Sequence, residues 1–129
     1  MTCTDRRLCC KNGILYLQEA AKPLFYSDLS AAEQDVAWDE VDLAMSRKQF
    51  TTYPDYTEAE LEGKGLLRVY VSTENDQSVN PDYQQFYIQA GKFDKVVKIP
   101  SGHAPMLSMP EKLADIIADV AKEASDRTA

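Results

Sequence analysis

The sequence predicts an α/β fold, and the second half of the 129-residue chain carries this prediction. Two short apolar runs rich in β-branched residues, 66–71 and 96–99, are each followed by a polar loop and then by an amphipathic helix. A strand that reaches the next strand through a helix usually lies parallel to it. We therefore expect two parallel strands with flanking helices. Hydrophobic residues make up 44% of the chain and charged residues 27%, as in globular proteins.

The first half of the chain predicts a partial strand and a helical segment. Residues 1–11 stay unassigned, and the apolar run at 14–17 suits a short strand. Residues 24–62 are expected to be helical, because Ser30 and Glu33 have the spacing of a capping box. Four small or apolar residues then recur at helical spacing and predict one helix face: Ala37, Val41, Ala44 and Met45. Pro54 should break this pattern, with a short polar helix or turn at 56–62.

The first strand of the second half is nearly continuous in its apolarity, which suits a strand covered on both faces of a parallel sheet. Pro81 occupies a position that a helix tolerates in its first turn, and Gly91 should end that helix. Its apolar face is expected to consist of four residues: Tyr83, Phe86, Tyr87 and Ala90.

The second strand should end at Pro100, and residues 101–105 form the loop that follows it. Ser108 and Glu111 have the spacing of another capping box, which predicts the start of the last helix. Its apolar face is expected to contain Leu113, Ile116, Ile117, Val120 and Ala121. We divide the chain into a segment at 12–62, a core segment at 63–124 and a frayed polar tail at 125–129.

Charge and cysteine content limit the functions that the chain can have. The formal net charge of -7 argues against a nucleic-acid partner and an anionic membrane surface. No apolar run approaches the ~20 residues that span a bilayer, and residues 1–11 lack the apolar stretch of a secretory signal, so we expect a cytoplasmic protein. Cys3, Cys9 and Cys10 are interpreted as incidental, because zinc needs about four ligands and His103 is the sole histidine. We expect neither a metal nor a cofactor.

Two polar residues follow the two predicted strands. Asp76 lies in the loop after the first strand and His103 in the loop after the second. Because the carboxyl ends of parallel strands meet at one edge of a sheet, we expect the two loops to lie side by side. A carboxylate beside an imidazole fixes its tautomer and stabilises the imidazolium. Glu74 is the alternative acid. An acid followed by a histidine is the α/β-hydrolase order Ser…Asp/Glu…His.

The residues around this pair resemble the α/β-hydrolases. Residues 69–79 look like the penultimate core strand and acid loop of that family, and residues 23–30 are similar to its helical lid. Residues 101–114, Ser-Gly-His-Ala-Pro-Met-Leu-Ser-Met-Pro-Glu-Lys-Leu-Ala, closely resemble the histidine loop and final helix of the methylesterase-like and hydroxynitrile-lyase-like branch. Gln84 also matches that branch, whereas Asn80 stands where proline is usual. The resemblance runs from about residue 12 to residue 124.

The resemblance implies the C-terminal part of an α/β-hydrolase fold, with His103 as general base and Asp76 as its orienting acid. It implies a small ester-like substrate, with cyanohydrin cleavage as a less favoured chemistry. The lid aromatics Phe25, Tyr26, Trp38 and Phe50 are assigned to packing in preference to an acyl pocket.

The chain lacks the Gly-x-Ser-x-Gly motif that carries the family nucleophile and also the oxyanion-hole segment. Two strands are fewer than the usual ~5–6 in a sheet, so the sheet is incomplete and its edge unpaired. We therefore expect a truncated product, a shortened gene model or one half of a split enzyme, inactive alone. The alternative is a non-catalytic binding module that pairs with a complementary chain or with a second copy of itself.

Overall fold

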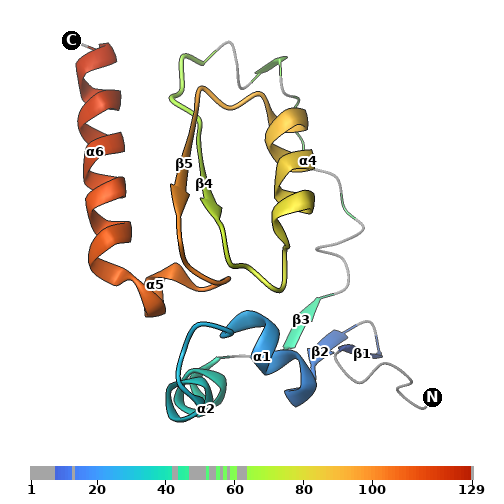
Figure 1. The fold of residues 1–129 in the computed structure, drawn as a ribbon. Coiled ribbons are helices and arrows are strands. Elements are labelled where there is room, and N and C mark those ends of the chain that lie inside the picture. The colour runs from blue at the N-terminus through green and yellow to red at the C-terminus, as the bar shows by residue number, and fades with distance from the viewer. Residues whose placement is uncertain are drawn as a thin grey trace.

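The predicted pair of parallel strands is present in the structure. A computed structural model describes residues 8–12, 14–41, 44–46, 52, 55, 57, 59–60 and 64–128. Strands β4 (Val69–Thr73) and β5 (Lys95–Ile99) run parallel, with Val69 opposite Lys95 and Thr73 opposite Ile99. Helix α4 (Pro81–Gly91) connects them, and helix α6 (Pro110–Thr128) follows; Figure 1 shows the strands between these two helices.

Local sequence explains where α4 begins and ends. The Asn80 side-chain oxygen accepts the Tyr83 N–H at 3.1 Å, which satisfies one of the free donors of the first turn. Pro81 follows it, as predicted, at a position that needs no N–H donor. The helix extends to Gly91, the residue expected to end it, and Lys92 then takes the left-handed conformation with φ 47°. Asn80 therefore serves as a helix cap where the resembling branch has proline.

The last helix differs from the prediction at both ends. Ser108 does not cap it: this residue ends the short helix α5 (Pro105–Ser108), and its hydroxyl donates to the Ala104 carbonyl. Helix α6 also continues through Thr128, beyond the predicted end at residue 124. Arg127 in the last turn pairs with Glu123 one turn earlier and with Asp94 beside β5. These ion pairs hold the last turn of the helix, and the periodicity of apolar residues alone does not predict them.

The first half contains the expected helical segment. It consists of the 3₁₀ turn η1 (Glu19–Ala21), helix α1 (Lys22–Phe25) and helix α2 (Ala31–Glu40), which together are called the cap segment below. The capping box is confirmed, because the Ser30 N–H donates to Glu33 at 2.9 Å and the Ser30 hydroxyl accepts the Glu33 N–H. The carboxyl ends of β4 and β5 point toward the cap segment (Figure 1).

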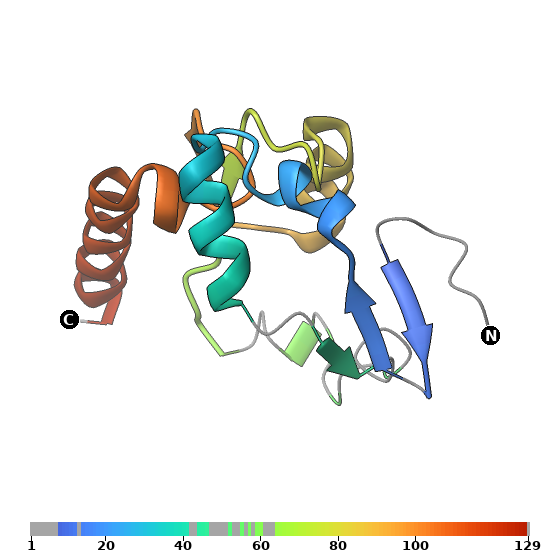
Figure 2. The same cartoon turned by 90° about the horizontal axis from the view of Figure 1, so that it is seen from below.

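The prediction that Ala44 and Met45 continue the helix is wrong. Helix α2 ends at Glu40, Val41 is extended, and β3 (Ala44–Ser46) pairs antiparallel with β2 (Ile14–Leu17). The first strand, β1 (Leu8–Lys11), pairs with the other edge of β2, so this small sheet has the order β1-β2-β3; Figure 2 shows it to one side of the helices. Pairing with a distant strand overrides helical spacing in so short a stretch.

Several expectations from the first half have other outcomes. Cys9 is buried and disulfide-bonded, so the interpretation of all three cysteines as incidental is wrong for this residue, whereas Cys10 is free and exposed. Pro54 and Phe50 lie outside the described residues. Within the part of the chain that the structure describes, no helix combines the length and apolarity needed to cross a membrane.

Candidate active site

Asp76 is the most heavily bonded side chain at the edge of the sheet. It lies in the loop after β4, residues 74–80, called the acid loop below, and is 4% exposed. Its Oδ1 atom accepts the backbone N–H groups of Ser78 and Val79, both at 2.8 Å. Its Oδ2 atom accepts the Thr73 hydroxyl at 3.0 Å and contacts His103. Four partners therefore fix the orientation of a single buried carboxylate.

His103 faces this carboxylate from the loop after β5, residues 100–104, called the histidine loop below. The distance between His103 Nδ1 and Asp76 Oδ2 is 3.0 Å. An ionised carboxylate only accepts hydrogen bonds, so this contact needs the proton on Nδ1, and in a neutral imidazole Nε2 then has the lone pair. The two loops lie together, as the parallel topology predicts, and the contact favours the neutral tautomer in which Nε2 can act as a base.

The environment of Asp76 favours its charged form. Burial alone would raise the pKa of this carboxyl, but hydrogen bonds from the Val79 N–H, from His103 and from the Ser78 N–H outweigh burial and hold the pKa below its ordinary value. The carboxylate is thus ionised at neutral pH. It can orient the imidazole and stabilise the positive charge that develops when Nε2 takes up a proton.

Backbone hydrogen bonds join the acid loop directly to the histidine loop. The Glu74 N–H donates to Ile99 at 2.9 Å, and the Asn75 N–H donates to the Ser101 carbonyl at 3.0 Å. The Asn75 side-chain amide adds a bond of 3.1 Å to the Pro100 carbonyl. Glu74, the alternative acid, is exposed and lies 3.6 Å from Lys98, so the structure does not bring it to His103.

Gln84 connects helix α4 to the strand that carries the acid loop. The residue is 1% exposed. Its side-chain oxygen accepts the Ser72 hydroxyl and the Thr73 N–H, and its amide nitrogen donates to the carbonyls of Thr73 and Val79. The same Val79 donates its N–H to Asp76. Gln84 thus holds both ends of the segment in which Asp76 lies.

Hydroxyl groups near the site are already engaged elsewhere. The Ser101 hydroxyl is buried and donates to the Gly102 carbonyl at 2.8 Å, the Ser72 hydroxyl donates to Gln84, and the Ser108 hydroxyl donates to Ala104. None of these three serines is bonded to His103. Their sequence context already argued against a nucleophile, and the geometry agrees.

The cap segment contacts the histidine loop at two points. The Phe25 ring stands edge-on to the imidazole, with a centroid distance of 4.9 Å and an angle of 84°. The Asp28 carboxylate accepts the Gly102 N–H at 2.5 Å. Sequence reasoning assigned Phe25 to packing and gave Asp28 no role, because no local spacing links a residue to a partner 74 positions away. Tyr26 is buried, as its assignment to packing requires.

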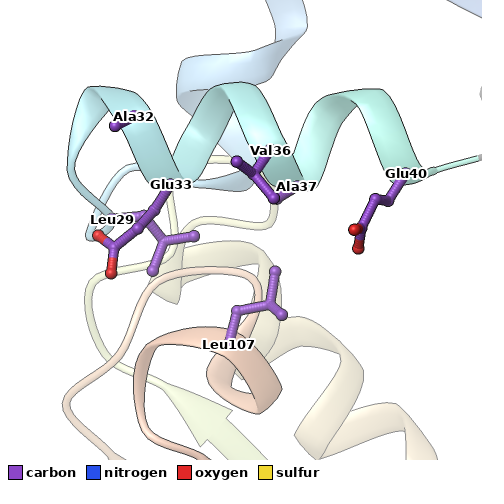
Figure 3. A pocket seen from close by; sticks show the side chains of 7 residues that line it. All are labelled: Leu29, Ala32, Glu33, Val36, Ala37, Glu40 and Leu107. Carbon is purple, nitrogen blue, oxygen red and sulfur yellow. The ribbon is translucent and has the colours of Figure 1, made fainter.

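Two open cavities flank this region. The first, about 450 Å³, borders the candidate pair, because Asp76 and His103 line it together with Tyr70, Val71 and Met106 among others. The second, about 360 Å³, lies between α2 and Leu107 of α5, and Figure 3 shows Val36, Ala37 and Leu107 facing it. Neither Asp76 nor His103 lines the second cavity. Of these two cavities, the first is therefore the one that borders the imidazole.

Comparison with known proteins identifies the fold. Polyneuridine aldehyde esterase superposes on 88% of this chain with a TM-score of 0.70 and 16% sequence identity. A pyrethroid hydrolase from Sphingobium faniae JZ-2 superposes on 93% of it with a TM-score of 0.71 and 23% identity. The chain covers 47% and 49% of these two structures, about half of their length. It therefore has the α/β-hydrolase fold, of which it contains the C-terminal part, as the sequence predicted.

Sequence comparison points in the same direction. "Probable hydrolase R7" from Phoma sp. is 44% identical over 57 residues, which are 40% of this chain and 23% of that protein. No protein-family model matches the chain. The sequence match to this hydrolase covers 40% of the chain, whereas the similarity in fold extends over 88% and 93% of it in the two structures above.

Proposed function

We propose that this chain supplies the acid and base of a carboxylic-ester hydrolase of the methylesterase-like branch. One observation carries the proposal: Asp76 Oδ2 lies 3.0 Å from His103 Nδ1, while both carboxylate oxygens are held by further donors. A buried, ionised acid behind the Nδ1 proton of a partly exposed imidazole is the arrangement that prepares a general base. The hydrolases among the similar proteins support the ester-hydrolase class.

In the proposed reaction, His103 Nε2 takes the proton of a serine hydroxyl as that serine attacks an ester carbonyl. The imidazolium that forms lies against the Asp76 carboxylate, which stabilises it and keeps the ring in place. His103 then returns the proton to the leaving alcohol, and water repeats the cycle to release the acid. Asp76 stays ionised throughout, because its other donors favour the carboxylate.

The nucleophile is proposed to come from outside these 129 residues. They contain no Gly-x-Ser-x-Gly, and the chain spans about half of the similar structures. The backbone donors of an oxyanion hole, worth about 10²–10³ in rate, belong to the same missing part. We therefore propose that the chain alone has no esterase activity. As separate proposals, the complete enzyme takes a small ester-like substrate and is cytoplasmic.

The test compares the 129-residue chain with a protein extended through the upstream in-frame sequence. Only the extended protein is expected to hydrolyse p-nitrophenyl acetate. His103→Ala should abolish that activity, and Asp76→Asn should lower kcat by about 10⁴-fold, because the amide no longer enforces the reactive tautomer. Asp82→Asn, at an exposed acid on α4, is the matched control. An extended protein whose activity survives His103→Ala would refute the proposal. If the 129-residue chain hydrolyses the ester and its His103→Ala variant does not, the proposal that the short chain is inactive is refuted.

A second candidate is a non-catalytic module that pairs with a complementary chain. The observation that favours it is the uncovered apolar surface of α4, where Tyr83, Phe86 and Tyr87 are exposed. Native mass spectrometry of the chain purified from its source would show a stable heteromeric or homomeric complex. A monodisperse monomer, together with an upstream Gly-x-Ser-x-Gly in frame, would exclude this candidate.

A further inference from the structure

One peptide group next to His103 is held from two sides. The carbonyl of the Ser101–Gly102 peptide accepts the Asn75 N–H at 3.0 Å, and the N–H of the same peptide donates to the Asp28 carboxylate at 2.5 Å. Asn75 belongs to the acid loop, whereas Asp28 belongs to the turn after α1, in the cap segment. Because a peptide group is planar, bonds at its oxygen and its nitrogen together fix the orientation of the whole plane.

The approach of Asp28 leaves no room for a side chain at position 102 unless the side chains of Ser27 and Asp28 shift. A Cβ atom built there would lie 2.5 Å from Asp28 Oδ1 and 2.9 Å from Ser27 Oγ. Among the described residues, the positive φ angles occur at Asn12, Gly65 and Lys92, so Gly102 is needed for space and not for an unusual backbone conformation. The sequence at 27–28 and the glycine at 102 therefore belong to one contact.

The next peptide toward His103 is also fixed. The buried Ser101 hydroxyl donates to the Gly102 carbonyl at 2.8 Å. Beyond it, the Phe25 ring supports the imidazole edge-on. Of these contacts, the one at Asp28 has an ionisable acceptor, and a charged acceptor makes a shorter and stronger hydrogen bond than a neutral one.

We propose that Asp28 is a positioning residue for His103, an inference that rests on the proposed function. Asp28 and Asn75 clamp the Ser101–Gly102 peptide from the cap and from the core, and this clamp keeps the imidazole aligned with Asp76. The cap segment thereby contributes to the base itself in addition to covering it. Loss of the Asp28 bond allows the histidine loop to turn, which lengthens the bond between His103 Nδ1 and Asp76.

The sole histidine in the chain makes this inference testable without any activity. In the ¹⁵N-labelled 129-residue chain, every imidazole signal belongs to His103. The parent should show a downfield Nδ1 proton and ¹⁵N shifts of the Nδ1–H tautomer. Asp76→Asn provides the reference spectrum for a broken contact. Asp28→Ala should broaden or remove the downfield proton and mix the tautomers. Asp28→Asn, which keeps an oxygen acceptor for the Gly102 N–H, should restore most of the parent spectrum.

Two further variants complete the test. Asp39→Ala removes an exposed acid of α2 and should leave the His103 signals unchanged. Gly102→Ala disturbs the same contact from the opposite side and should reproduce the effect of Asp28→Ala; it decides the question if Asp28→Ala does not fold. A folded Asp28→Ala or Gly102→Ala protein with the parent tautomer and downfield proton would overturn the inference.

Activity measurements distinguish a failure of this inference from a failure of the proposed function. In the extended protein, Asp28→Ala should lower kcat by about 10²-fold with little change in KM, because a misplaced base slows proton transfer more than it weakens binding. If His103→Ala leaves activity intact, the proposed function fails, whereas the spectra still report whether Asp28 positions the ring. If the spectra do not respond to Asp28→Ala while His103→Ala is inactive, only the positioning role fails.

Discussion

At the scale of single residues, Asp76 combines burial with charge. A carboxylate that loses water must regain hydrogen bonds, and Asp76 regains them from Thr73, Ser78, Val79 and His103. The two backbone donors are three residues away or nearer, so the acid loop wraps around its own side chain. The site therefore tolerates an ionised acid at its centre and makes it the anchor of both loops.

The hydrogen bonds of the Asp76 carboxylate predict that the folded protein loses stability in acid. The folded-state pKa of Asp76 is depressed, so at low pH the unfolded chain binds more protons than the folded one, and the free energy of unfolding falls as pH falls. The contribution of Asp76 should be complete above its unfolded pKa of about 3.9 and should disappear as pH falls through the lower folded value. Urea titrations at a series of pH values from about 6 downward measure it.

Asp76→Asn is the matched variant for that measurement. It should be less stable than the parent at pH 6 by about 1–3 kcal/mol, since the NH₂ group of the new amide would face groups that are themselves hydrogen-bond donors. The difference between the two proteins should shrink as the parent is acidified. Other carboxyls with lowered pKa values, at Glu33, Glu60, Asp94 and Glu123, titrate equally in both proteins and cancel. A parent-to-variant difference that does not change with pH would contradict this account of the anchor.

At the scale of elements, Gln84 is the link between a helix and a strand that share no backbone hydrogen bonds. Gln84→Leu keeps the approximate size of the side chain but leaves three buried groups and the half-buried Val79 carbonyl without their bonds to Gln84. Each unsatisfied buried group costs about 1–3 kcal/mol, so we expect a loss of about 3 kcal/mol or more in the free energy of unfolding. The neighbouring Gln85 is exposed on the same helix, and Gln85→Leu should change stability by less than about 0.5 kcal/mol. Equal effects in the two variants would show that Gln84 does not join these elements.

The elements also show what the sequence can predict. Strands β4 and β5 were predictable because each is a short apolar run followed by a loop and an amphipathic helix, and right-handed parallel connection then brought Asp76 and His103 to one edge. Strand β3 was not, because Ala44 and Met45 also fit helical spacing and their pairing with β2 joins segments about thirty residues apart. The Asp28 contact was unpredictable for the same reason, since it spans 74 positions.

At the scale of the whole molecule, the core that the described residues form contains few apolar side chains. Its apolar members are Cys9, Ala21, Tyr26, Ile99 and Ala104, whereas Ser72, Asp76, Gln84 and Ser101 are buried polar residues. Phe86 is 66% and Ile117 is 58% exposed, on faces that the sequence marks as apolar. The polar side chains of the site thus have their hydrogen-bond partners, whereas large apolar side chains on the helices stay exposed.

This imbalance predicts how the isolated chain behaves in solution. Unfolding should expose little additional surface, so the dependence of its unfolding free energy on urea should lie at the lower end of the range for small proteins, about 1 kcal/mol per M.

The folded chain should also bind a hydrophobic dye such as 1-anilinonaphthalene-8-sulfonate. Phe86→Ser and Ile117→Ser should each reduce dye fluorescence without lowering Tm, because neither side chain is buried in this chain. If upstream residues supply further strands, as proposed above, the same substitutions should instead lower Tm in the extended protein, because the added strands and helices would cover these faces. A short chain that binds no dye and unfolds with a steep urea dependence, about 2 kcal/mol per M or more, would show that its apolar faces are already covered.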